Sequence, residues 1–161
     1  MMIKLLGSLA VLGIAAILAV RGASVFRERI AQLEGFVLLV RRIREQIACF
    51  RTPQEQILAG FDDPALGRAG FLEVATREGM AAALSAVRDR LYLGESELAA
   101  LSEFASGLGG GYAEEELVRC DLCLSRLTLA LDARREALPK AARLYRTLVL
   151  SGALAIIIVL I

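Results

Sequence analysis

The sequence contains no histidine and no tryptophan. Without an imidazole group, the chain cannot form a Ser-His or Cys-His nucleophile pair, a histidine base or a histidine-ligated metal site. Hydrophobic residues nevertheless make up 57% of the 161 residues, and this figure does not count the 14 glycines. Soluble domains average only about 45–50% even when glycine is counted. The composition therefore argues against most enzyme classes and against a water-soluble single domain.

Charged side chains are absent from both ends of the chain. Residues 5–20 and 147–161 carry none, whereas residues 21–146 carry 36 charged side chains among 126 positions. All 18 acidic residues fall within this middle part. A charged middle of this kind is typical of a soluble domain, and the two ends require a different environment.

Each uncharged end predicts a short transmembrane helix, over residues 1–21 and over residues 144–161. Sixteen residues extend about 24 Å as a helix, less than the roughly 30 Å of a hydrocarbon core, so basic flanks such as Lys4 must extend the span by snorkelling. A cleaved signal peptide is the alternative at the N-terminus, but Arg21 follows the apolar run directly and no small-x-small pair lies at that point to be cut. A buried core helix is the alternative at the C-terminus, but that segment is apolar on every side.

Basic residues flank both predicted spans on the side of the charged middle. They are Arg21, Arg27 and Arg29 after the first span, and Arg134, Arg135, Lys140, Arg143 and Arg146 before the second. Because cytoplasmic flanks are enriched in Lys and Arg, we expect residues 22–143 to form a cytoplasmic domain.

The middle of the chain has helical patterns and no strand pattern. Apolar residues recur at spacings of three and four from Phe26 to Phe50, with one slip at Arg44. Start signals at Thr52-Pro53 and Asp63-Pro64 introduce short helices that end near Gly60 and Gly79, two further helices follow before Gly107, and a long returning helix comes last. Its stripe consists of Leu117, Cys120, Leu124, Leu127, Leu131 and Leu138. Pro139 should kink or break that helix. The predicted fold is all-α, an antiparallel bundle of about five to six helices between the two transmembrane helices.

Cys120 and Cys123 form a C-x-x-C motif, which suggests either a redox pair or half of a zinc site. Both lie within a helical stripe, and only Cys49 remains as a further thiol in a chain without histidine. We therefore favour small apolar core residues, and keep a thiol redox or metal-binding membrane protein as the alternative function.

The segment Gly107-Leu108-Gly109-Gly110-Gly111 precedes the long returning helix. It lacks the preceding strand and the spacing of a dinucleotide-binding loop, and it predicts a flexible turn between antiparallel helices. Glu114, Glu115 and Glu116 open the next helix, where the macrodipole favours acids. Because residues 52–133 sum to a charge of −8, we expect a basic partner to dock at these glutamates and nucleic acid to be repelled.

Small residues recur four apart in both predicted spans. Ala15 and Ala19 form one pair, and Ser151 and Ala155 form the other. Small-x-x-x-small pairs let transmembrane helices approach closely, so these residues are candidates for helix packing or self-association. Ordinary transmembrane composition is the alternative explanation.

Several segments together resemble the stage III sporulation protein AB family, which is related to the F-type membrane proteins of type II secretion. They are Ile3-Lys4-Leu5-Leu6-Gly7, Gln32-Leu33, Thr52-Pro53, Leu108-Gly109 and the run from Leu144 to Gly152. The similarity covers nearly the whole chain. It departs from the family pattern at Gly110 and Gly111, where the family has a polar pair.

The resemblance implies a non-enzymatic, two-pass platform in a sporulation channel or secretion-like complex. It also implies a location on the mother-cell side, in the outer forespore membrane, and coupling of a cytoplasmic secretion-type ATPase to other subunits. No catalytic residue, cofactor or metal ligand is expected.

We predict that both termini lie across the membrane from residues 22–143, because the basic flanks lie on the side of that segment. A reporter enzyme fused after Ile161 should show the activity of an exported protein. Activity typical of a cytoplasmic reporter at that position would contradict the predicted orientation.

Overall fold

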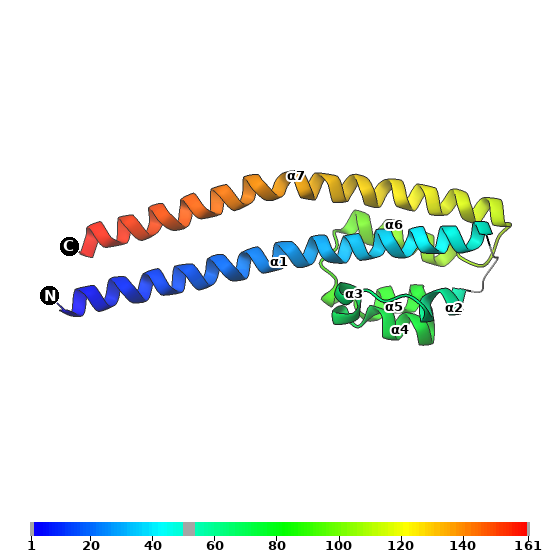
Figure 1. The fold of residues 1–161 in the computed structure, drawn as a ribbon, viewed down its shortest axis with the longest axis horizontal. Coiled ribbons are helices and arrows are strands. Elements are labelled where there is room, and N and C mark those ends of the chain that lie inside the picture. The colour runs from blue at the N-terminus through cyan, green and yellow to red at the C-terminus, as the bar shows by residue number, and fades with distance from the viewer. Residues whose placement is uncertain (1, 50–53, 161) are drawn as a thin grey trace. The chain divides into compact units, whose positions relative to one another are not determined.

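The computed structural model describes the backbone of residues 2–49 and 54–160, and the side chains of residues 24–49 and 56–137 together with Thr147 and Ser151. These residues form seven α-helices and one short 3-10 helix, and the described part of the chain contains no strand (Figure 1). The helices are α1 (Met2–Cys49), α2 (Gln54–Ala59), α3 (Pro64–Ala69), α4 (Phe71–Glu78), α5 (Met80–Ala86), η1 (Arg88–Arg90), α6 (Glu95–Gly107) and α7 (Ala113–Leu160). The predicted all-α helical fold is confirmed.

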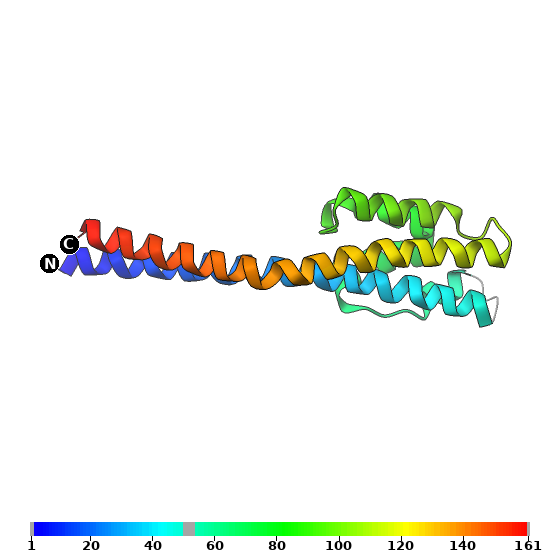
Figure 2. The same ribbon diagram turned by 90° about the horizontal axis from the view of Figure 1, so that it is seen from above.

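The chain divides into two compact units. One combines the N-terminal part of α1, up to Arg27, with the C-terminal part of α7, from Arg134, and these two helical segments run antiparallel (Figures 1 and 2). The other comprises Glu28–Ala133 and contains the remainder of α1 and α7 with all the shorter helices.

The two predicted transmembrane segments stay predictions. Across the residues whose side chains are described, no helix is both long enough and apolar enough to span a bilayer. Apart from Thr147 and Ser151, the side chains of residues 1–21 and 144–161 lie outside that set. Ala15, Ala19 and Ala155 are among them, whereas Ser151 is exposed on α7.

The long returning helix is not interrupted at Pro139. The prediction was a kink or a break, and helix α7 continues from Ala113 to Leu160, so the break does not occur. A proline removes one backbone donor and crowds one preceding turn, while the hydrogen bonds of the other turns remain. In a helix of 48 residues, that local loss does not end the helix.

The core of the Glu28–Ala133 unit is built on one face of α1. Of the predicted stripe, Leu33, Val37, Val40 and Ile43 are buried, but Phe26 is 44% exposed. Two residues outside the stripe, Phe36 and Leu39, are also fully buried. The ring of Phe36 packs edge-to-face on Phe71 of α4, with 4.9 Å between centroids. Sequence periodicity thus located this face but underestimated its width, because α1 is covered by several short helices.

Helix α3 begins against α1 at a position where α1 has a glycine. The Oδ1 atom of Asp63 accepts hydrogen bonds from the backbone N–H groups of Ala65 and Leu66, both at 2.9 Å, which confirms the predicted cap. A Cβ atom at Gly35 would lie 2.8 Å from that same oxygen and 3.0 Å from Cγ of Leu66. Gly35 therefore allows the capped end of α3 to approach the backbone of α1.

The single helix predicted between Pro64 and Gly79 is in fact two helices. Gly70 has φ 77°, a left-handed conformation that ends α3 and precedes α4. The predicted stop at Gly79 is confirmed, with φ 89°. The start signal at Thr52-Pro53 lies outside the described residues.

Gln32 connects α1 to the non-helical segment after η1. Its side chain is 2% exposed. The Nε2 group donates to the carbonyl of Arg90 at 3.3 Å, and Oε1 accepts from the N–H of Tyr92 at 2.7 Å. The amide therefore bonds the carbonyl of the last residue of η1 and the N–H of a residue in the segment that follows it.

We predict that Gln32→Ala lowers the free energy of unfolding by about 1–3 kcal/mol, because both backbone groups lose their buried partner. The measurement is chemical denaturation of the full chain in detergent micelles, followed by circular dichroism. Gln56→Ala, which changes an exposed glutamine of α2, serves as the control. Equal stability of the two variants would show that water replaces the amide without cost.

Candidate functional site

The turn between α6 and α7 is held by side chains of α7. Helix α6 ends at Gly107, and Gly109 adopts φ 83°, a left-handed conformation that favours glycine. The N–H of Gly109 donates to Oε1 of Glu116 at 2.7 Å, and the guanidinium of Arg119 donates to the carbonyl of Gly107. The turn was predicted as flexible, and neither contact could be predicted from the local sequence pattern.

The three glutamates at the start of α7 have different roles. Glu116 is half-buried and holds the turn through Gly109. Glu114 and Glu115 are exposed, and neither has a hydrogen bond or ion pair with any residue whose side chain is described. Tyr112 precedes them and is 83% exposed. Two of the three predicted docking residues are therefore available to a partner, while the third maintains the local structure.

Cys120 and Cys123 lie on the buried side of α7. They are 0% and 3% exposed, and neither forms a disulfide. The Sγ atom of Cys123 lies 3.9 Å from the carbonyl oxygen of Ala100 on α6. Burial raises the pKa of Cys120 to about 11 and that of Cys123 to about 12. Because the thiolate is the reactive form, this environment suits core residues and disfavours thiol chemistry at neutral pH.

The apolar stripe predicted for this helix lists Leu124, the neighbour of Cys123, on the core side. In the structure Cys123 is buried and Leu124 is half-buried. Over the residues with described side chains, no group of three or more cysteine, aspartate or glutamate side chains could hold a metal ion.

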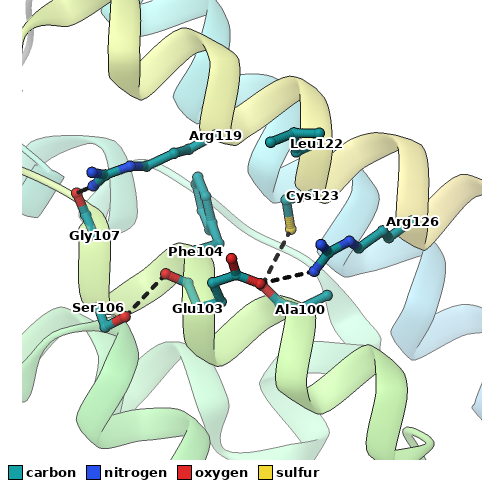
Figure 3. Close-up of a pocket in the computed structure, with 9 residues that line it drawn as sticks. All are labelled: Ala100, Glu103, Phe104, Ser106, Gly107, Arg119, Leu122, Cys123 and Arg126. Atoms are coloured by element: carbon teal, nitrogen blue, oxygen red, sulfur yellow. Dashed lines mark hydrogen bonds and ion pairs between the residues drawn. The ribbon is translucent and has the colours of Figure 1, made fainter.

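A pocket of about 300 Å³ opens between α6 and α7 (Figure 3). Arg119 and Arg126 lie at its two ends, with Phe104 and Cys123 between them. Both arginines already have partners, because Arg126 contacts the carboxylate of Glu103 at 2.8 Å and Arg119 bonds the end of α6. The pocket thus has an apolar floor and charged ends that each contact another residue of the same unit.

An ion pair joins α1 and α7 at the slip in the apolar stripe of α1. The Nε atom of Arg44 lies 2.6 Å from Oδ1 of Asp121. The hydrogen bond to Asp121 raises the pKa of Arg44. The polar residue that interrupted the predicted stripe therefore has a defined partner on the returning helix.

Comparison with protein families gives one result that spans nearly the whole chain. The model of the family described as stage III sporulation protein AB matches residues 4–161. Neither the curated proteins nor the solved structures contain a match to the sequence.

We predict that the stability of the protein falls as the pH rises above 9, because the two thiols ionise in the unfolded chain while remaining neutral in the folded one. Each thiol should contribute a loss of about 1 kcal/mol by pH 10. Chemical denaturation at pH 8 and pH 10 measures this loss. The variant Cys120→Ala/Cys123→Ala should lose less stability over the same interval, and an equal loss would contradict the assignment to these thiols.

Proposed function

The chain belongs to the stage III sporulation protein AB family, and from this premise we propose that it is a non-enzymatic, membrane-anchored platform of a sporulation channel or secretion-like complex. In this role it couples a cytoplasmic secretion-type ATPase to other subunits in the membrane. Family membership points to a role and a location associated with sporulation. The anchoring, the lack of enzymatic activity and the identity of the partners are the proposed parts.

The observation that carries the proposal is the continuity of the two long helices. Helices α1 and α7 each have 48 residues, and each contributes to both compact units. Their outer ends contain the uncharged residues 5–20 and 147–160. A helix that continues from an apolar anchor into a packed unit suits a protein that holds a domain at a membrane.

The polar groups of the Glu28–Ala133 unit support a structural rather than a catalytic role. Asp63, Glu97 and Glu116 bond backbone N–H groups at helix starts or in the α6–α7 turn. Arg68 pairs with Glu28 at 2.9 Å, and Arg126 pairs with Glu103. These side chains maintain helix ends and helix contacts, which is the use expected in a scaffold.

Glu114 and Glu115 provide the surface proposed to face the ATPase. They are exposed and lie in a segment, residues 52–133, whose charge sums to −8. Charge on an exposed surface mainly sets orientation and association rate, and individual exposed pairs contribute only about 0–1 kcal/mol. The expected effect is therefore collective and sensitive to salt.

We predict that Glu114→Lys/Glu115→Lys slows association with the cytoplasmic ATPase about tenfold or more at low salt, because attraction is replaced by repulsion. Glu116 is left unchanged because it holds the α6–α7 turn. The measurement is the association rate of the full chain in micelles at low and high salt. Cross-linking in sporulating cells followed by mass spectrometry identifies the protein that is captured.

The control Glu78→Lys/Asp89→Lys makes the same change in net charge at exposed residues of α4 and η1. It should slow association much less if the start of α7 is the docking surface. If both variants bind at the wild-type rate and with the same salt dependence, Glu114 and Glu115 are solvated surface and the ATPase docks elsewhere.

A further inference from the structure

Helix α7 has a second apolar stripe on the face opposite its buried one. Val118, Leu122 and Leu129 are 58%, 57% and 75% exposed, and the exposed Ser125 lies between the two leucines. Their spacing of four, three and four residues places all of them on one side of the helix. The opposite side carries Cys120, Cys123, Leu127 and Leu131, which are buried in the core. Three large apolar side chains therefore face outward in a row at the spacing of a coiled-coil seam.

Charges of opposite sign flank this stripe. Glu114 and Asp121 occupy one edge, and Arg119 and Arg126 occupy the other, each pair being seven residues apart. In heptad notation, with Leu122 and Leu129 at positions a, the two acids are at g and the two arginines at e. All four side chains are exposed.

This arrangement of charges is complementary to itself in one orientation. In a parallel pair of helices, a g residue faces the e residue five positions further along the partner. Glu114 then faces Arg119 of the second helix and Asp121 faces Arg126, and symmetry repeats both pairs. An antiparallel pair would instead bring acid against acid and arginine against arginine.

We propose that the exposed face of α7 between Glu114 and Leu129 binds the same face of a second copy of this chain, with the two helices parallel and in register. The apolar stripe supplies the buried contact, and the g and e charges select the partner and its direction. The seam is short and has a serine at its centre, so the association is weak unless the copies are concentrated in one membrane.

The ion pairs within one chain are compatible with this pairing. Arg44 and Asp121 are 40% and 56% exposed, and Arg126 and Glu103 are 58% and 73% exposed. A guanidinium has five donors and a carboxylate about four acceptor sites, so each group can bind an internal and an external partner together. Leu122 also lines the pocket between α6 and α7, which extends the apolar face toward Phe104 (Figure 3).

The inference goes beyond the proposed function and stands without it, because it uses only residues of the Glu28–Ala133 unit. The two are separable by experiment. The variant Arg126→Glu should weaken pairing while leaving Glu114, Glu115 and the contact of Arg119 with the α6–α7 turn unchanged.

Cysteine cross-linking of the full chain in micelles tests the register. Val118→Cys and Ser125→Cys are made separately in a Cys49→Ala background, which removes the exposed native thiol. We expect oxidation to link each variant to its own copy, because parallel in-register helices place identical seam residues side by side. Positions 118 and 125 are about 10 Å apart along the helix, so an antiparallel pair can link at most one of them. Ser102→Cys, at an exposed position of α6, should remain unlinked.

Charge reversal gives a second test that does not depend on new thiols. Glu114→Lys/Asp121→Lys and Arg119→Glu/Arg126→Glu should each raise the dissociation constant for pairing about tenfold or more, and an equal mixture of the two variants should restore it. Sedimentation in micelles measures the pairing. Arg44→Gln and Glu103→Gln, which remove only the internal ion pairs, should pair like the wild type.

Linking at both positions together with rescue by the mixture supports the proposal. A chain that stays monomeric and unlinked while circular dichroism shows it folded overturns it. Linking at a single position indicates an antiparallel or shifted pair, and pairing that ignores the charge reversals indicates that another face mediates it. Either result overturns the proposal.

Discussion

The Glu28–Ala133 unit depends on the close contact that α1 makes with the short helices through Gln32, Gly35 and Phe36. These residues span little more than one helical turn, and each makes a different contact with the covering segments. Gln32 satisfies the backbone of the segment after η1, Gly35 admits the capped start of α3, and Phe36 fills the core against Phe71. The short helices α3 and α4 have six and eight residues, too few to be stable alone. They exist because this turn of α1 provides the surface on which they fold.

Much of this architecture follows from local sequence rules. Asp63-Pro64 predicted a helix start because a carboxylate suits the N-cap and a proline suits the first helical position. In the structure Asp63 is the N-cap of α3 and Pro64 is its first residue. The stripe from Leu33 to Ile43 located the buried face of α1 because helical periodicity is a local property. The division at Gly70 was missed, because Gly70 and its neighbours also fit one continuous helix and only tertiary packing selects the left-handed turn. Gly35 was missed for the same reason, since its role depends on an oxygen atom 28 positions later in the chain.

The candidate site shows the same limit. Sequence alone indicated an acidic start of α7 but did not separate Glu116, which bonds the N–H of Gly109, from its exposed neighbours Glu114 and Glu115. It also treated Arg44 as a defect in an apolar stripe, whereas the structure pairs it with Asp121 at a separation of 77 residues. Long-range partners of charged side chains leave no periodic signal, so such pairs become visible only in three dimensions.

The contact between Gln32 and Tyr92 also has a consequence for the synthesis of the protein. The two residues are 60 positions apart, so a ribosome working at about 5–20 residues per second needs roughly 3–12 s to add the second after the first. During that interval the buried face of α1, including Leu33, Phe36 and Val40, has been made but its covering helices are incomplete. The residues that complete the cover of this apolar face are therefore made seconds after the face itself, so its final packing waits for synthesis of the segment after η1.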